Sequence, residues 1–331
     1  MACVALAMVS CGAKSATQEE AAEVDSAEVA VSEVYFIKDI TPENLLKIYE
    51  ALNREAEGRV AVKLSTGEPG GHNFLNPDLI KDLVQMVNGT IVECNTAYAG
   101  KRMNTADHLQ AAKDHGFTAI AEVDIMDAEG EMQIPVTGGK HLQYDIVGNH
   151  LTNYDFMVVL SHFKGHAMGG FGGVLKNASI GVASTAGKAY IHSAGKTDNA
   201  TKAWLPGNLA SGKTQDDFLE SMAAAAQGVA DVFGKNIIYI SVMNNMSVDC
   251  DCVSHPDEPL LQDRGIMASL DPVAVDKACL DLVFNITPSE GDDNGPLLER
   301  IKSRHGTHIV EWGEHIGLGS SNYVIVDLDQ R

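Results

Sequence analysis

The sequence is short of positive charge. Its 331 residues include 24 lysines and arginines against 45 aspartates and glutamates, which gives a formal net charge of −21. This excess of negative charge repels nucleic-acid phosphates and provides no basic patch for anionic lipids, so we exclude nucleic acid as a partner. The sequence also has no apolar run long enough to form a membrane-spanning helix. Attachment to a membrane would therefore need another means.

Cysteine is scarce as well, with six in the whole chain. No three of them are spaced by two residues, and the absence of this pattern argues against a ferredoxin-type iron–sulfur cluster. Cys94 and Cys279 lie in apolar patterns and are expected in the core. Cys250 and Cys252 lie beside acidic residues and His255, and alternate residues of an extended segment point to one side. We predict that these two cysteines bind a metal; an ordinary thiol pair or an oxidised pair are the alternatives.

The N-terminal segment differs in composition from the rest. Residues 2–10 are small and apolar, and Met8-Val9-Ser10-Cys11 resembles the lipobox of bacterial lipoproteins. We therefore expect residues 1–11 to be a lipoprotein signal, with a lipid anchor at Cys11 as the only membrane attachment. This places the protein in the cell envelope, periplasmic or anchored to the outer membrane. The alternative is a frayed segment on a cytoplasmic protein. Residues 12–32 are polar and acidic and are expected to form a disordered tether.

Apolar runs alternate with amphipathic segments along the remainder of the chain. This pattern predicts an α/β fold with a mainly parallel, Rossmann-like sheet flanked by helices. We expect two lobes with a cleft between them, residues 33–200 and 201–331. The predicted strands are 33–37, 59–64, 90–94, 118–125, 154–161, 236–243, 265–269 and 321–327. The predicted helices are 41–56, 77–88, 104–115, 214–233, 271–285 and 296–304.

A glycine-rich segment, residues 162–177, is the strongest candidate for a functional site. Glycines allow close backbone approach and expose N–H groups to a ligand, and the charged side chains would lie at the rim. The residues predicted to bind a cofactor or ligand are Lys164, Gly169, Gly170, Gly172, Gly173, Lys176 and Asn177. The lysines would favour an anionic ligand in this acidic protein. The alternative is that the glycines form a tight crossover and the histidines satisfy buried backbone groups.

Loops at the carboxyl ends of parallel strands meet at one edge of a sheet, where such folds bind ligands. His72 follows the predicted strand 59–64, Tyr98 follows 90–94, and the glycine-rich segment follows 154–161. We therefore predict that His166, Lys176, Tyr98 and His72 are catalytic. Cys250 and Cys252 are the metal ligands predicted from the residues themselves, and nickel, iron and zinc remain open as the metal.

The segment resembles a widespread bacterial family of unknown function whose members are often fused to ferredoxin modules. The resemblance rests on Lys164-x-His166, on Lys176-Asn177 and on Lys188-x-x-x-His192. A second match is residues 263–276, which begin Asp-Arg-Gly and end Asp-Pro-Val-Ala-Val-Asp. Together these motifs indicate that most of residues 33–285 belong to the resemblance.

Local spacing is also similar to that of the nickel-pincer lactate racemase. This resemblance implies that Lys176 tethers a nickel-pincer cofactor, that His192 binds its nickel and that His166 exchanges the hydroxyl proton of the substrate. Two racemase features are absent. No histidine follows the strand 90–94, and the loop 65–72 has no arginine for a cofactor phosphate, although Lys63, the loop amides or His72 could substitute.

Two functional hypotheses follow. The first is a metal-dependent or metallocofactor-dependent enzyme, of oxidoreductase or isomerase type, that acts on a small anionic hydroxy or oxo acid. The second is a non-catalytic, lipid-anchored protein that binds a metal or small ligand. Residues 207–214 also match the spacing of a phosphate-binding loop, but no buried apolar strand precedes them. We predict a plain loop there, with Thr214 as the cap of the following helix.

Overall fold

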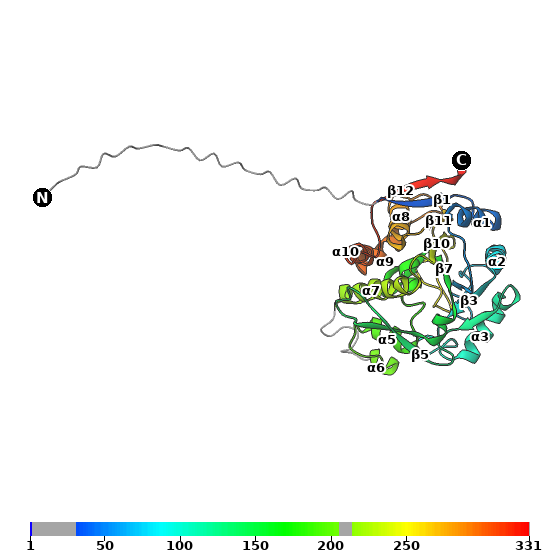
Figure 1. The fold of residues 1–331 in the computed structure, drawn as a ribbon. Helices are drawn as coiled ribbons and strands as arrows, with labels where there is room; N and C mark the ends of the chain where they lie inside the picture. The colour runs from blue at the N-terminus through cyan, green and yellow to red at the C-terminus, as the bar shows by residue number, and fades with distance from the viewer. Residues whose placement is uncertain (2–30, 205–213, 331) are drawn as a thin grey trace.

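An eight-stranded sheet forms the centre of the molecule. The computed structural model describes residue 1, residues 31–204 and residues 214–330. The strand order is β12-β1-β11-β10-β7-β2-β3-β4 (Figure 1), and every strand runs parallel to its neighbour except β11, which is antiparallel to β1 and β10. The strands of this sheet are β1 (Ser32–Ile37), β2 (Val60–Lys63), β3 (Gly89–Glu93), β4 (Val123–Ile125), β7 (Phe156–His162), β10 (Ile237–Met243), β11 (Gly265–Ser269) and β12 (Tyr323–Asp327).

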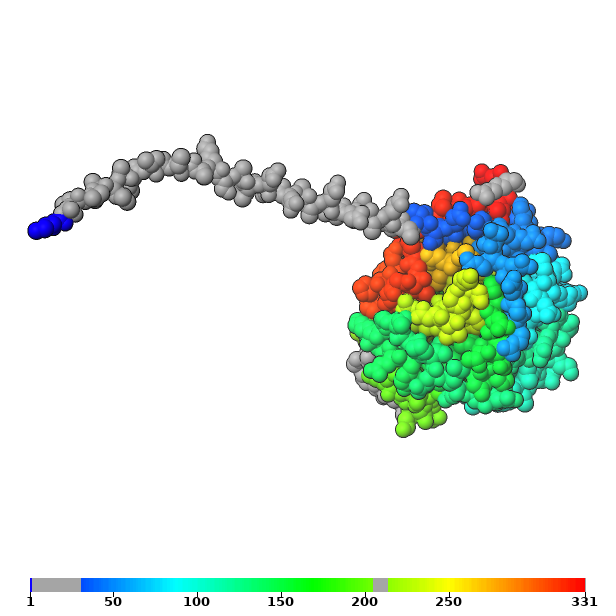
Figure 2. All heavy atoms as spheres, viewed as in Figure 1, coloured from blue at the N-terminus to red at the C-terminus, as the bar shows by residue number. Residues whose placement is uncertain are grey.

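Burial explains which strands lie in the middle. Every residue of β7 and β10 is buried, because helices cover both faces of the sheet there, and such strands are continuously apolar rather than alternating. By contrast, β12 is an edge strand, and Val324 and Ile325 on it are exposed. Figure 2 shows β12 (red) against the blue segment that contains β1, at one end of the molecule.

Helices cover the two faces of the sheet in two groups. The helices α1 (Pro42–Ala51), α2 (Pro77–Met86) and α3 (Thr105–Asp114) pack on one face. The other face carries α4 (Val174–Ala178), α5 (Thr185–His192), α7 (Gln215–Phe233), α8 (Pro272–Phe284) and α10 (His308–His315), with α6 (Ala200–Ala203) beside α5 and α9 (Gly295–Ser303) beside a small hairpin. Figure 1 shows these groups on opposite sides of the strands.

Local sequence signals set several helix ends. Thr41 and Asn76 cap α1 and α2 and are each followed by proline, whose fixed φ suits the first helical position. Thr214 caps α7 in a reciprocal capping box with Asp217, as predicted. Gly234 ends that helix with a φ of 56°, a conformation that disfavours other residues.

The predicted α/β class with a mainly parallel, helix-flanked sheet is confirmed. Two lobes are not confirmed, since the one sheet contains strands from both sides of residue 200. The predicted strand 118–125 was too long: a 3-10 turn occupies Phe117–Ala119 after Gly116, whose φ is 90°, and only Val123–Ile125 joins the sheet. Residues 2–30, which contain the predicted signal and most of the tether, and residues 207–213 lie outside the described residues.

Two small hairpins and four helices were not predicted. The first hairpin joins β5 (Glu131–Pro135) to β6 (Tyr144–Gly148), and the second joins β8 (Lys164–His166) to β9 (Gly170–Gly172). They are too short to show a periodic pattern. The helices α4, α5 and α6 are also too short to show one. The helix α10 was not predicted either. Among the described residues, no helix is long and apolar enough to cross a bilayer.

Candidate functional site

The carboxyl ends of the parallel strands β2, β3 and β7 line one cavity of about 240 Å³, and the segment after β10 adds Asp251 and Cys252 to its wall. Lys63 ends β2, Glu93 ends β3 and His162 ends β7, while Asn244 follows β10. The residues of the cavity wall used below are Lys63, Glu93, Cys94, Tyr98, Arg102, Ser161, His162, Lys164, His166, Gly173, Lys176, Asn177, Gly181, Lys188, His192, Trp204, Asp251 and Cys252. The wall thus carries five lysine or arginine side chains against two carboxylates, an excess of positive charge in an acidic protein.

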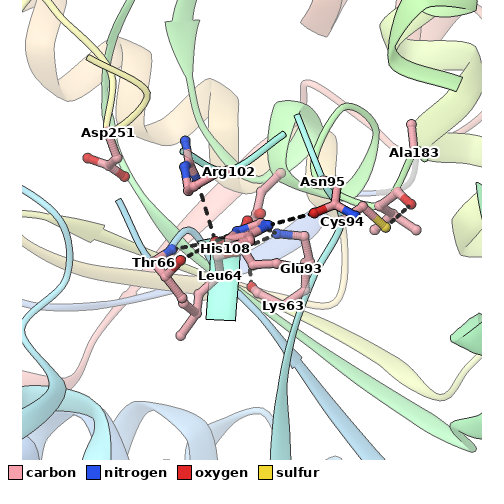
Figure 3. A network of polar contacts seen from close by, with 12 residues as sticks. Lys63, Leu64, Thr66, Glu93, Cys94, Asn95, Arg102, His108, Ala183 and Asp251 are labelled. Carbon is pink, nitrogen blue, oxygen red and sulfur yellow. Dashed lines mark hydrogen bonds and ion pairs between the residues drawn. The ribbon is translucent and has the colours of Figure 1, made fainter. Parts of the chain in front are cut away.

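Glu93 is the centre of the polar network in Figure 3. Its carboxylate accepts hydrogen bonds from the Thr66 amide at 2.6 Å and the Thr66 hydroxyl at 2.7 Å. The Lys63 ammonium lies 3.7 Å away and the Arg102 guanidinium 3.5 Å away. Burial alone would raise the pKa of Glu93, but Lys63 and the neighbouring His108 lower it well below the usual range. A buried carboxylate with these partners stays ionised.

Arg102 links this network to the loop after β2. Its Nε donates to Glu68 at 2.9 Å, and its Nη2 donates to the Tyr98 hydroxyl at 3.0 Å. The Tyr98 hydroxyl in turn donates to Glu68 at 3.2 Å. Burial raises the pKa of Tyr98 to about 12, so the phenol stays protonated at neutral pH. Tyr98 faces the cavity as a hydrogen-bonding group rather than a phenolate base.

Asp251 holds a second group of cations. The Lys164 ammonium lies 2.8 Å from one carboxylate oxygen of Asp251, and His162 Nδ1 lies 2.9 Å from the other. His162 Nε2 lies 2.6 Å from the carbonyl of Asn244, so both ring nitrogens face acceptors. Burial would raise the pKa of Asp251, but Lys164 and His162 lower it far below the usual range.

The glycine-rich hairpin brings His166 to the cavity. A Cβ on Gly165 would lie 2.2 Å from the carbonyl oxygen of Val248, so only glycine allows this close approach. The Gly169 amide donates to His166 Nδ1 at 2.7 Å, and the neutral ring therefore carries its proton on Nε2. Burial and the positive charge of Lys176 lower the pKa of His166 well below its usual value. His166 presents an N–H donor, since Nε2 has no hydrogen bond among the described residues.

The short helix α4 positions Lys176. Both carboxylate oxygens of Asp276 accept the first amides of this helix, from Val174 at 2.8 Å and Leu175 at 2.9 Å. A Cβ on Gly173 would lie 2.1 Å from Asp276 Oδ1, so Gly173 leaves room for this cap. The next residue along, Asn177, donates from its side chain to the Lys63 carbonyl at 3.0 Å and to Ser161 Oγ at 2.9 Å. The helix is thereby fixed to the ends of β2 and β7.

The Lys176 amine has no hydrogen bond or ion pair with any described residue. Burial, together with the positive charge of Lys164, lowers the pKa of Lys176 from its ordinary value of 10.5 to about 7. A large fraction of this lysine is therefore a neutral amine at physiological pH, and a neutral amine is both a nucleophile and a base.

His192 lies in the last turn of α5. Its Nδ1–H donates to the Lys188 carbonyl at 2.6 Å, which leaves the Nε2 lone pair available. Burial lowers the pKa of His192 to about 4, so the ring is neutral at pH 7. Phe218 stacks on the ring with 4.9 Å between centroids. His166 and His192 thus have opposite hydrogen-bonding polarity, one a donor and the other an acceptor.

Three groups of side chains among the described residues bring potential metal ligands within 4.8 Å of one another. The first consists of His166, Cys250 and Cys252 at the cavity, where the two cysteines form a disulfide. The other two lie near the start of α7: His141, Asp217 and Glu220 form one, and Asp216, His305 and His308 form the other. The grouping with the cysteines contains His166 and not His192, which was the histidine predicted from the sequence.

The structure brings most of the predicted site residues together. His166, Lys176, Tyr98, Lys164, Gly173, Asn177, His192 and Cys252 all line the cavity, and Cys250 is buried behind Cys252. His72 does not line it: its side chain is 55% exposed and pairs with Glu258 at 3.5 Å. Gly169, Gly170 and Gly172 are also absent from the wall, and Gly170 packs against Gly306 instead.

Sequence reasoning did not single out five charged residues of the wall as site residues. These are Lys63, Glu93, Arg102, Lys188 and Asp251. A signal was present for two of them, because Lys63 and Glu93 are charged residues at the ends of otherwise apolar strands. Lys188 was part of the family motif Lys188-x-x-x-His192 but was given no role, whereas Arg102 and Asp251 have no such local signal, since only tertiary contacts bring them to the same wall.

A family model described as a domain of unknown function, DUF362, matches residues 60–281. The chain belongs to this family. The match includes both motifs on which the resemblance was based, and the structure explains them. The first motif supplies residues of the cavity wall: Lys164, His166, Lys176, Lys188 and His192. In the second, Asp271 caps α8 by accepting from the amides of Val273 and Ala274, and Asp276 caps α4. A comparison with curated proteins finds no significant match.

Similar solved structures include the lactate racemase apoprotein from Thermoanaerobacterium thermosaccharolyticum. It is 12% identical, with a TM-score of 0.44, and the match covers 76% of this chain and 57% of that one. A structural-genomics protein from Thermotoga maritima is 10% identical, with a TM-score of 0.43, and the match covers 74% of this chain and 60% of that one. The chain therefore spans less than two thirds of either structure.

The residues present are compatible with part of the ligand set implied for a nickel-pincer cofactor. Lys176 offers an amine at the cavity wall, and His192 offers an Nε2 lone pair with Nδ1–H fixed by a backbone carbonyl, an arrangement found in metal-binding histidines. If bound, such a cofactor would supply a centre that accepts a hydride. The side chains of this protein would hold it through Lys176 and His192. The cofactor itself stays a prediction.

Proposed function

We propose that this protein is an enzyme of the isomerase or oxidoreductase type that acts on a small hydroxy or oxo acid, with Lys176 as its reactive amine. The observation that carries the proposal is the Lys176 amine, which pairs with no described residue and lies in a small cavity whose wall has more cations than carboxylates. A cavity of about 240 Å³ suits a small ligand, and its excess positive charge favours an anionic one.

The cations of the wall have different roles in this proposal. Lys63 and Arg102 are paired with Glu93, and Lys164 is paired with Asp251. Lys188 donates to the backbone carbonyls of Ala183 and, at 3.4 Å, of Cys94, and among the described residues it forms no direct ion pair with a carboxylate. We propose that the substrate carboxylate lies near Lys188 and Lys164, and that the reacting carbon lies beside the Lys176 amine.

The two histidines suit proton movement beside that amine. His166 presents an N–H donor toward the cavity and His192 an acceptor, and both rings are neutral because burial lowers the pKa of each. A donor can stabilise negative charge on a hydroxyl or oxo oxygen, and an acceptor can receive a proton. The Lys176 amine can in addition attack the carbonyl of an oxo acid, with loss of water, to form an imine.

Reductive trapping tests the proposal directly. The full-length protein is incubated with pyruvate and sodium borohydride at pH 7.5, and modified peptides are located by mass spectrometry. Borohydride reduces an imine to a stable secondary amine, so we expect the label on Lys176. The Lys176→Arg variant should lose it, since a guanidinium does not form the imine. The control Lys81→Arg, at an exposed position on α2, should be labelled at Lys176 as in the parent protein.

Other outcomes would refute the assignment. Labelling spread over surface lysines, and unchanged in Lys176→Arg, would show that Lys176 has no special reactivity. Saturable pyruvate binding by calorimetry without any labelling at Lys176 would favour the non-catalytic binding protein instead. A pH series gives a further check: labelling should rise with an apparent pKa of about 7, the pKa of the Lys176 amine.

A further inference from the structure

The disulfide between Cys250 and Cys252 lies on the wall of the cavity. Cys250 is buried, whereas Cys252 is half-buried and lines the cavity. A ring nitrogen of His166 and the two sulfur atoms all lie within 4.8 Å of one another. Neither sulfur takes part in the ion pairs and hydrogen bonds described above for Glu93 and Asp251.

The residue between the cysteines is fixed to the rest of the site. The Asp251 carboxylate is bound by His162 and Lys164, and the Asp251 carbonyl accepts the Glu68 amide at 2.8 Å. These contacts do not depend on the bond between the sulfur atoms. If the disulfide is reduced, Asp251 therefore still holds the segment in place, and both thiols stay close to His166.

We propose that Cys250, Cys252 and His166 form a redox-controlled metal site, which is closed as the disulfide and binds one thiophilic divalent cation, such as zinc, once reduced. Reduction takes two electrons and two protons from a dithiol, which itself becomes a disulfide. Metal binding then replaces the two thiol protons, which are released. At His166, the ion binds the lone pair of one ring nitrogen and the ring proton stays on the other nitrogen, so the hydrogen bond from the Gly169 amide to Nδ1 is lost in either case.

The donor set determines what kind of site this would be. Two thiolates and one imidazole suit zinc and similar ions, and three protein ligands leave one coordination position open. Cys252 and His166 both face the cavity that contains Lys176, so the open position would face the substrate. This inference rests on the proposed function and deepens it: the ion would polarise the hydroxyl or oxo group of the acid while the lysines hold its carboxylate.

Redox control follows from the same residues. A disulfide has no thiolate to offer, so the site has its metal ligands only under reducing conditions. The other two metal-ligand groups among the described residues contain only imidazoles and carboxylates, so they would bind ions irrespective of thiol oxidation. Sulfur ligation therefore identifies the proposed site.

Cobalt(II) is a suitable probe because charge transfer from thiolate to cobalt gives an absorption that imidazole and carboxylate ligands do not give. The full-length protein, stripped of metal, is titrated with cobalt(II) anaerobically, either oxidised or after reduction with a phosphine. We expect one equivalent with the thiolate absorption in the reduced protein and no such absorption in the oxidised protein. Cys252→Ser and His166→Ala should each weaken binding by at least about tenfold. Cys279→Ala, which removes a buried thiol away from the cavity wall, should not.

Two results would overturn the proposal. One is a reduced parent protein that shows no thiolate absorption. The other is an absorption that persists in the double variant Cys250→Ser/Cys252→Ser, which would assign it to other cysteines. Should the variants fail to fold, alkylation of the parent protein decides instead: bound zinc should protect Cys250 and Cys252 from iodoacetamide after reduction, and equal labelling with and without zinc would contradict the site. Pyruvate trapping on the oxidised, metal-free protein tests the proposed function separately, since Lys176 itself needs no metal to form an imine.

Discussion

Replacing Lys176 with methionine should stabilise the protein at neutral pH. The folded state holds this ammonium at a cost, because burial and Lys164 lower its pKa from 10.5 to about 7. Because proton binding and folding are linked, this lowering of the Lys176 pKa corresponds to a destabilisation of the folded state on the order of 4 kcal/mol at pH 7. Methionine has a similar length and no charge, so Lys176→Met should recover much of that free energy of unfolding while it abolishes labelling by pyruvate.

The sign of the pH dependence makes this prediction specific. A lysine whose pKa is lowered on folding destabilises the protein fully below the folded pKa, and the cost disappears as the pH rises toward the unfolded value. The advantage of Lys176→Met should therefore be largest at or below pH 7 and vanish near pH 10.5.

Urea denaturation followed by circular dichroism at several pH values measures the effect. The control Lys81→Met, at an exposed position on α2, should change the free energy of unfolding by less than about 0.5 kcal/mol at every pH. If Lys176→Met lowers stability at pH 7, or if its effect does not vary between pH 7 and 10, the amine is not held at an electrostatic cost. The reasoning that makes Lys176 reactive would then be wrong.

Two further substitutions test how the site is built. Arg102→Lys should cost about 2 kcal/mol in urea denaturation, because an ammonium cannot replace the forked contacts to Glu68, Tyr98 and Glu93. Arg59→Lys, at an exposed ion pair, should cost less than about 1 kcal/mol, and equal effects would show that the buried fork contributes nothing special. Gly173→Ala should lower stability by about 1–3 kcal/mol and reduce trapping at Lys176, because its Cβ would displace the carboxylate that caps α4. Gly172→Ala, whose Cβ would meet nothing closer than 3.7 Å, should have a much smaller effect on stability; a tolerated Gly173→Ala would contradict the role given to this cap.

The structure changes the interpretation of the glycine-rich segment. The sequence suggested that its glycines wrap a ligand with bare N–H groups. Gly165 and Gly173 instead allow close packing, one against the backbone of Val248 and the other against the Asp276 carboxylate. Their effect on the cavity is indirect, since they allow the hairpin and α4 to hold His166 and Lys176 at the wall. The glycines thus serve close packing, as in the alternative interpretation, and this packing also supports the cavity wall.

The sequence by itself determined the elements with strong local signals. Continuous apolar runs defined β7 and β10, and the Thr41 and Asn76 caps followed by proline defined the starts of α1 and α2. The parallel order implied that loops at the strand ends meet at one edge, which brought Tyr98, Lys164 and Lys176 together correctly. The same rule misplaced His72, because following a strand does not fix the direction of a side chain.

Only the tertiary structure decided the chemistry of the cavity. Arg102 and Asp251 are polar residues in loops, and neither their spacing nor their neighbours in the sequence reveal the buried partners that keep them ionised. The low pKa of Lys176 likewise arises from burial and from the positive charge of Lys164 on the same cavity wall, which are properties of packing. The local pattern of apolar and polar residues indicates which side of a helix or strand is buried. The pKa values of a buried site depend instead on distances between segments that are remote in the chain.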